Sequence, residues 1–246
     1  YSIIGGFVRD FVFNRKAFRI PPSVIKSLDR AQLYALEAAR QALTDAGVLD
    51  GPKPFDGTKC AVWLGNTMGG EMRITTAGRS EVRDMSGKLK RLLEETSMSR
   101  DEVRTLCKQF EVEANAGRPP ITEDSMPGEL PNCIAGRIAS TFDLGGPNWV
   151  MDAACASSLA ALDVAVGHLR RGSVDHALVG GVDALMGVEG YVKFCKIGAL
   201  SPDGSRPFDA SANGFVMGEG AAMMVLMRRS EAEREGHRIY GLIKGI

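Results

Sequence analysis

The chain has 246 residues, and its 30 lysines and arginines balance 30 aspartates and glutamates, so the formal net charge at pH 7 is zero. Hydrophobic residues make up 44% of the chain and charged residues 24%, close to the averages of globular proteins, which excludes wholesale disorder. The balanced charge argues against nucleic acid or an anionic membrane surface as the main partner, and no apolar stretch reaches the roughly 18 residues of a membrane-spanning helix.

Strand and helix patterns alternate along the chain, which favours an α/β sheet over separate α and β regions. In the first part, a helix is predicted over 29–46, because apolar residues recur there at helical spacing and Gly47 is suited to end the helix. A short apolar run over 60–64 predicts a buried strand, which ends at the glycine-containing turn 65–70.

The middle of the chain departs from this pattern. Residues 80–116 are charged and are predicted to form a helical surface excursion with amphipathic helices of its own. The apolar residues on one face of these helices are Val103, Leu106, Cys107 and Phe110. The charged run 83–104 is most simply a solvated helical face, with docking of a carrier protein as the alternative. A loop is expected over 118–128 and a short helix over 130–142.

The second half of the chain is more regular. Strands are predicted over 149–153, 176–182 and 220–227, helices over 156–171 and 230–235, and a last strand from Arg238. Ser230 and Glu233 have the spacing of a capping box at the start of the last helix. The chain opens on Tyr1 rather than methionine, and its apolar end resembles a strand in mid-course, so we expect a piece of a longer protein.

The five cysteines are odd in number and lie far apart, at positions 60, 107, 133, 155 and 195. A chain of this length can bury a large core without disulfide bonds, so we expect free thiols in a reducing compartment, the cytoplasm. The cysteines contain no C-x-x-C pair and the three histidines do not cluster with them, so no metal site is expected.

Cys155 is the residue whose position suggests chemistry. It lies between the predicted strand 149–153 and the predicted helix 156–171, in the stretch DAACASS. Such a junction presents a side chain at the carboxyl edge of a sheet. The free amides and the positive dipole end of the helix then favour a thiolate nucleophile and can hold an oxyanion. The alternative is a buried packing cysteine, because free cysteine is among the most buried residue types, and the sequence shows no general base beside it.

This stretch resembles the active-site segment of β-ketoacyl synthases, the condensing enzymes of fatty-acid and polyketide assembly. Other segments follow the same family's order and spacing: 131–138 (PNCIAGRI), 145–148 (GGPN), 180–183 (GGVD), 199–201 (ALS), 206–209 (RPFD) and 214–221 (GFVMGEGA). The similarity covers nearly the whole chain and is weakest over 71–116. Residues 122–129 and 193–198 are most similar to synthases of multidomain polyketide or polyunsaturated-fatty-acid systems.

The resemblance implies the thiolase-like fold, an α/β fold whose two similar halves form five αβαβα layers, with residues 1–246 as part of the N-terminal half. It also implies a homodimer in which Cys155 accepts an acyl group from a phosphopantetheine thioester on an acyl carrier protein. A malonyl-type extender then decarboxylates and attacks the acyl-enzyme. No cofactor is tightly bound, because the phosphopantetheine arrives on the carrier protein. The remaining C-terminal half and further domains of the same polypeptide are the other expected partners.

The two histidines that assist decarboxylation in this family stand in segments that the sequence does not contain, and we expect them beyond Ile246. His168 lies on the predicted helix about 20 Å from Cys155 at about 1.5 Å per residue and on a different face, so it cannot replace them. His176 and His237 receive no role either.

The resemblance also points to pocket and interface positions. Met68 and Phe194 resemble residues that line the acyl pocket, although both are equally compatible with core packing. The loop 122–132 resembles one that contributes to the dimer interface and to the partner's pocket. Glu219 is interpreted as a buried structural carboxylate in preference to a member of the site.

Three other functions remain open on the sequence. The first is a coenzyme A-dependent thiolase or an initiating condensing enzyme, against which 206–209 and 214–220 resemble elongating synthases. The second is a non-catalytic chain-length-controlling partner of a ketosynthase, and such partners characteristically lack the cysteine found here at Cys155. The third is an unrelated cysteine hydrolase, which releases a free acid instead of forming a carbon–carbon bond.

Overall fold

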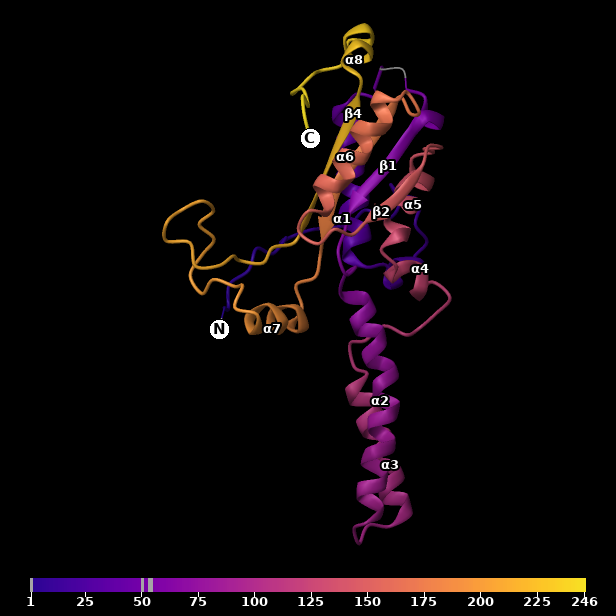
Figure 1. The fold of residues 1–246 in the computed structure, drawn as a ribbon. Helices are drawn as coiled ribbons and strands as arrows, with labels where there is room; N and C mark the ends of the chain where they lie inside the picture. Colours follow the sequence, from indigo (N-terminus) through magenta and orange to yellow (C-terminus); the bar gives the residue numbers. More distant parts are fainter. Residues whose placement is uncertain (1, 50, 53–54) are drawn as a thin grey trace.

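The computed structural model describes residues 2–49, 51–52 and 55–246. Its centre is a four-stranded sheet of order β2-β1-β3-β4 (Figure 1). The strands are β1 (Cys60–Gly65), β2 (Asn148–Met151), β3 (His176–Asp183) and β4 (Gly220–Met227). β1 is parallel to β2 and β3, whereas β4 runs antiparallel to β3. The carboxyl ends of β1, β2 and β3 therefore meet at one edge of the sheet.

Helices cover both faces of the sheet, so the body has three layers. The three helices are α1 (Arg30–Asp45), α5 (Asn132–Thr141) and α6 (Ser157–Arg170). α1 and α5 pack on one face, where Val62 and Leu64 of β1 belong to the larger core, and α6 packs on the other face with Trp63. All three of these β1 side chains are fully buried. The α/β sheet expected from the alternating patterns is confirmed.

α1 agrees with the helix predicted over 29–46 to within one residue at each end. Asp29 caps it by accepting a hydrogen bond from the backbone N–H of Ala31 at 2.8 Å. The same carboxylate accepts a bond of 2.7 Å from the N–H of Met72, at the start of the next helix. Burial raises the pKa of Asp29, and these two bonds oppose that effect. One buried side chain thus fixes the starts of two helices.

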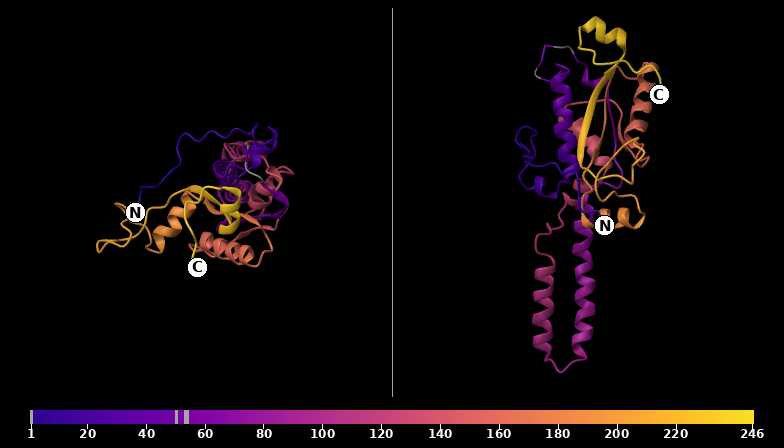
Figure 2. Two further views of the ribbon diagram at one scale, coloured as in Figure 1. Left: turned by 90° about the horizontal axis from the view of Figure 1, so that it is seen from above. Right: turned by 90° about the vertical axis from the view of Figure 1, so that its left-hand side faces the viewer.

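α2 (Glu71–Glu94) and α3 (Arg100–Ala114) form a helical hairpin that projects from the end of the sheet (Figures 1 and 2). The helices begin at residue 71, whereas the predicted excursion began at residue 80. Val103 and Cys107 are buried as predicted, but Leu106 is 40% exposed, because two helices alone bury only a narrow stripe. Ser99 and Glu102 form a capping box at the start of α3, a sequence signal that was missed.

The remaining elements are short. They are the 3₁₀ turns Val24–Ser27 and Gly57–Lys59 and the helices α4 (Ser125–Glu129), α7 (Val188–Lys196) and α8 (Arg229–Glu235). α4 lies in the segment predicted as a loop, and α7 was not predicted. α7 and the long connection that follows it lie to one side of the sheet (Figure 1). Within the described ranges, no helix combines the length and the apolar character needed to cross a bilayer.

Two predictions for the end of the chain are wrong. The expected strand from Arg238 does not form, because residues 238–246 make no backbone ladder with β4 or another described strand, and a strand needs such a partner. The Tyr240 hydroxyl instead donates to the Asp45 carboxylate at 2.9 Å. Ser230 does not cap α8, because the helix already begins at Arg229. Arg229 pairs with Glu233, the residue expected to complete that capping box, at 2.6 Å.

His176 begins β3 with its imidazole buried in the core. The ring is 5% exposed and packs against Phe55, with 4.9 Å between the ring centroids. Neither ring nitrogen has a hydrogen-bond partner among the described residues. Burial lowers the pKa of His176, because the charged imidazolium would lose its hydration there.

We expect His176 to make the folded state less stable at acidic pH. The unfolded chain protonates this imidazole near its ordinary pKa of about 6.5, and the folded chain only at lower pH, so the free energy of unfolding falls as pH drops below about 6.5. Urea unfolding at several pH values, followed by circular dichroism, measures this slope. His176→Phe is expected to flatten it, while His168→Gln keeps it. An unchanged slope in His176→Phe would show that other groups cause it.

Candidate active site

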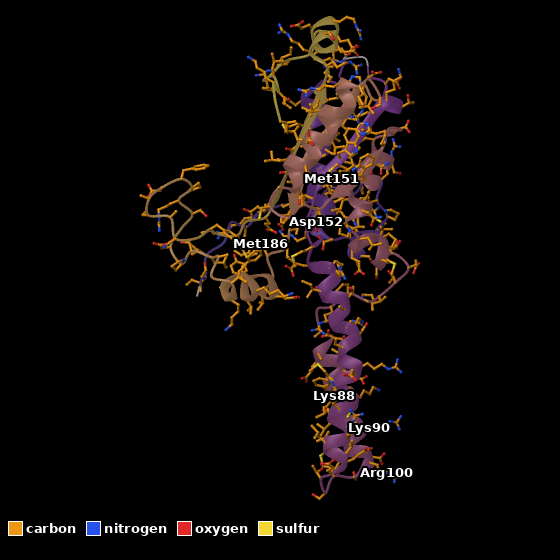
Figure 3. All side chains as sticks on the ribbon, viewed as in Figure 1. Lys88, Lys90, Arg100, Met151, Asp152 and Met186 are labelled. Atoms are coloured by element: carbon orange, nitrogen blue, oxygen red, sulfur yellow. The ribbon has the colours of Figure 1, made fainter. Side chains whose placement is uncertain are left out.

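Cys155 lies in the turn that joins β2 to α6. Of the five cysteines, all of which lie in the described residues, it alone is exposed. Figure 3 labels Met151 and Asp152 where the chain leaves the sheet for this turn. α6 begins at Ser157, one residue later than predicted, so the sulfur stands just ahead of the helix. Its position at the carboxyl edge of parallel strands is where α/β folds hold ligands.

The first turn of α6 presents unpaired donors close to Cys155. In the part of the chain that the structure describes, the backbone N–H groups of Ser158 and Leu159 donate no hydrogen bond. Ala156 precedes the helix and offers no side-chain cap. These free amides and the positive end of the helix dipole favour an anion, such as a thiolate or the oxyanion of an attacked carbonyl.

Ala154, directly before Cys155, has a strained backbone. Its φ of +50° lies in the left-handed region, which costs a residue with a side chain about 1 kcal/mol or more. The Ala154 N–H donates to Asp152 Oδ1 at 3.0 Å, and the Ala154 carbonyl accepts from the Ser157 hydroxyl at 2.6 Å. Side-chain bonds on both sides of this residue therefore hold its conformation.

Gly65, the last residue of β1, explains how α6 comes so close to the sheet. A side chain at this position would bring a Cβ atom to 2.4 Å from the Ser158 nitrogen and 2.5 Å from the Ser157 carbonyl carbon. Only glycine leaves room for that backbone contact. The start of α6, and with it the turn of Cys155, therefore lies directly over the end of β1.

A pocket of ≈ 520 Å³ opens beside Cys155. Its walls include Asn66 after β1, Ser158 at the start of α6, Asp183 at the end of β3 and Ala222 in β4. Asn66 is 3% exposed and donates from Nδ2 to the Val182 carbonyl at 2.9 Å. The thiol thus faces a hollow formed where three strands and one helix meet.

The other cysteines have different surroundings. Cys60 and Cys107 are buried, and Cys133 and Cys195 are half-buried. Burial raises the pKa of Cys60 to about 12, so this thiol stays protonated and unreactive. The structure therefore separates Cys155 from the rest by access to solvent.

Comparison with known proteins places this geometry in a family. The sequence profile described as "Beta-ketoacyl synthase, N-terminal domain" matches residues 1–232. The chain belongs to this family. The PKS-NRPS hybrid synthetase ATPKS of Aspergillus niger is 34% identical over 247 residues, which cover 100% of this chain and 11% of that protein. A polyunsaturated fatty acid synthase protein of Thraustochytrium sp. is 31% identical over 246 residues, which cover 100% of this chain and 8% of that protein.

A solved structure gives the same answer for the fold. The ketosynthase from module 6 of the bacillaene synthase of Bacillus subtilis 168 is 30% identical, with a TM-score of 0.63 over 93% of this chain and 32% of that chain. The predicted ketosynthase family and its thiolase-like fold are confirmed. The chain spans about a tenth of the two relatives and about a third of the solved ketosynthase.

The structure does not bring the three predicted site residues into one cavity. Met68 lies in the loop after β1, 51% exposed and with a φ of +65°. Phe194 is half-buried on α7, where its ring meets Phe215 edge to face at 5.6 Å. Neither Met68 nor Phe194 lines the pocket beside Cys155. Their contact with an acyl chain stays a prediction.

His168 and Glu219 do not line the pocket beside Cys155. His168 packs its ring against Trp63 at 4.8 Å, near the far end of α6 from Cys155. The side chain of Glu219 is almost fully buried and accepts bonds of 3.0 Å from the Val8 N–H and from Arg30 Nη2. Glu219 therefore joins the N-terminal segment to α1.

Sequence reasoning missed the polar side chains that hold the turn. In the structure Thr67 and Asp152 follow β1 and β2, and Ser157 begins α6, positions where polar residues often bind backbone groups. Thr67 and Asp152 are 85 positions apart, yet their side chains meet at 2.7 Å. The pairing of β1 with β2 brings the two side chains together. A local sequence pattern does not reveal this contact.

We expect Gly65→Ala to disturb the site by pushing α6 from the sheet. A backbone clash of this kind costs about 1–3 kcal/mol of folding free energy. Chemical unfolding measures the loss, and the rate of Cys155 alkylation reports the displaced turn. Gly87→Ala is the matched control, because no atom lies within 4 Å of the added Cβ. It is expected to stabilise α2 by roughly 0.5–1 kcal/mol. Equal stability of Gly65→Ala and the native protein would refute the contact.

Proposed function

We propose that this chain supplies the nucleophile of a β-ketoacyl synthase that lengthens acyl chains in polyketide or polyunsaturated-fatty-acid assembly. The single observation that carries the proposal is the Cys155 sulfur, exposed in a turn before free helix amides in a chain of the ketosynthase family. The relatives are named as polyketide and polyunsaturated fatty acid synthases, which supports this substrate class.

In the first half of the proposed reaction, Cys155 takes up the acyl group. Its thiolate attacks the carbonyl carbon of an acyl phosphopantetheine thioester on an acyl carrier protein. The negative charge that develops on the carbonyl oxygen is stabilised by amides such as those of Ser158 and Leu159. Collapse of this intermediate breaks the old carbon–sulfur bond and releases the carrier thiolate, leaving the acyl group on Cys155.

In the second half, a malonyl-type extender on the carrier protein loses carbon dioxide and its carbanion attacks the acyl-enzyme. A carbon–carbon bond forms, the bond to the Cys155 sulfur breaks, and the thiolate returns. Decarboxylation needs groups that stabilise the developing enolate. None of the three histidines, all in the described residues, lines the pocket beside Cys155, so we propose that residues outside this chain supply these groups.

The proposal includes partners and surroundings. The phosphopantetheine arrives on the carrier protein, so no tightly bound cofactor is required. We also propose that the protein is a homodimer and carries further domains on the same polypeptide. It would work in a reducing compartment such as the cytoplasm, because Cys155 must remain a thiol to react.

Covalent trapping tests the nucleophile. We expect a β-lactone or a chloroacetyl acyl mimic to modify the full-length protein at Cys155, as read by peptide mass spectrometry. Cys155→Ala should abolish acyl loading, whereas Cys107→Ala, which alters a thiol buried in the hairpin, should leave it intact. Modification at Cys133 or Cys195 with Cys155 untouched would overturn the assignment. Release of free acid would favour a hydrolase, and loading from coenzyme A alone would favour a thiolase.

Met68 and Phe194 are proposed to contact the acyl chain. Replacing either residue by tryptophan should then reduce loading of long acyl thioesters more than short ones, because the indole ring occupies space that the acyl chain needs. Rates of loading for a series of acyl lengths on Met68→Trp and Phe194→Trp measure this preference. Met85→Trp is a matched control, because Met85 is also 51% exposed but lies on the hairpin. An unchanged length preference in both variants would exclude the pocket role.

A further inference from the structure

The hydroxyl of Thr67 connects the ends of two neighbouring strands beside Cys155. Thr67 follows β1, and its Oγ1 lies 2.7 Å from Oδ1 of Asp152, which follows β2. Oγ1 of Thr67 also lies 3.1 Å from the Ser157 hydroxyl and 3.4 Å from the Ala154 carbonyl oxygen. One side chain from the β1 loop thus reaches three points of the turn that carries the thiol.

The hydrogens in this cluster can be assigned from the acceptors. The Asp152 carboxylate only accepts, so the Thr67 hydroxyl donates to it. The Ser157 hydroxyl donates to the Ala154 carbonyl and accepts from the Ala153 N–H at 2.9 Å. Each hydroxyl has one hydrogen, and each is used once. Both hydroxyl hydrogens are therefore donated within the turn, which they hold together.

Asp152 is ionised in this cluster. The bond from Thr67 is the largest cause that lowers the pKa of Asp152, and backbone N–H groups of Ala154 and Met68 act in the same direction. The carboxylate is therefore a fixed acceptor for the hydrogen bonds of the turn, and its contribution to the site is geometric.

The geometric contribution acts on Ala154. This residue would leave the left-handed region at φ +50° if its bonds were lost, because that conformation is unfavourable for alanine. Asp152 holds its N–H and Ser157 holds its carbonyl, while Thr67 fixes the direction of the Asp152 carboxylate. A change in the backbone conformation of Ala154 would rotate Cys155, the residue that follows it.

We infer that Thr67 and Asp152 are positioning residues: their hydrogen bond holds Ala154 in its left-handed conformation and so aims the Cys155 sulfur at an incoming thioester. This inference rests on the proposed function of Cys155 as the acyl acceptor. It differs from that function, because the thiol can be reactive without being well aimed. A misoriented Cys155 sulfur attacks a bulky thioester more slowly, but it still reacts with a small alkylating reagent, which can approach from many directions.

The test compares acyl loading with iodoacetamide alkylation at Cys155 in the full-length protein. We expect Thr67→Val to slow acyl loading by about 10- to 100-fold, the effect of losing a hydrogen bond to a charged group. Alkylation of Cys155 should change little, and Thr67→Ser should recover most of the loading rate. Asp152→Ala, which removes the acceptor of the bonds from Thr67 and Ala154, should also slow loading while alkylation changes little.

Thr58→Val is the matched control. Thr58 donates to Asp56 Oδ1 at 2.6 Å in the turn that precedes β1, so the variant removes the same kind of bond at the opposite end of the strand. We expect native rates of loading and alkylation from it.

Each outcome decides the inference. Native loading by Thr67→Val, or Thr67→Ser no better than Thr67→Val, would overturn it. Equal losses of loading and alkylation would show general damage to the turn and also overturn it. If Thr67→Val does not fold, Asp152→Ala decides by the same two rates. Absence of acyl loading at Cys155 in the native protein would instead refute the proposed function itself.

Discussion

The structure around the thiol depends on the contact between the first turn of α6 and the backbone at the end of β1. Gly65 permits this contact, because any side chain there would overlap the main chain of Ser157 and Ser158. Gly181 of β3 lies beside it, and a Cβ there would come to 3.0 Å from the Cβ of Ser158. The helix start is therefore set by two glycines of adjacent parallel strands, and the turn of Cys155 has little freedom to move.

This constraint explains why a solvent-exposed residue is so well defined. Cys155 has few neighbours of its own, yet the residues on either side of it are fixed. Ala154, which precedes it, is held in a strained conformation by hydrogen bonds. The first turn of α6, which follows it, packs against Gly65. The scaffold thus places the sulfur without covering it, which suits a group that must meet a large thioester.

Much of the fold follows from local patterns, whereas the support of the site does not. β1, β3, β4 and α1 match their predicted spans because a continuous apolar run or a helical stripe defines each. The strand expected from Arg238 failed because an apolar run forms a strand only beside a partner. Cys155 was found from its place between strand and helix and from the family resemblance. Thr67 escaped notice because its partner, Asp152, is distant in sequence and is brought near only by strand pairing.

The hairpin of α2 and α3 has its own small apolar stripe, and few bonds join it to the body. At its base, the Met72 N–H donates to Asp29 at 2.7 Å and the Thr76 hydroxyl donates to Glu129 at 2.6 Å. Opening of this arm therefore requires little loss of the packing around the sheet. We therefore expect the hairpin to open as a separate unit, with its amide hydrogens exchanging with solvent before those of β1 and β3.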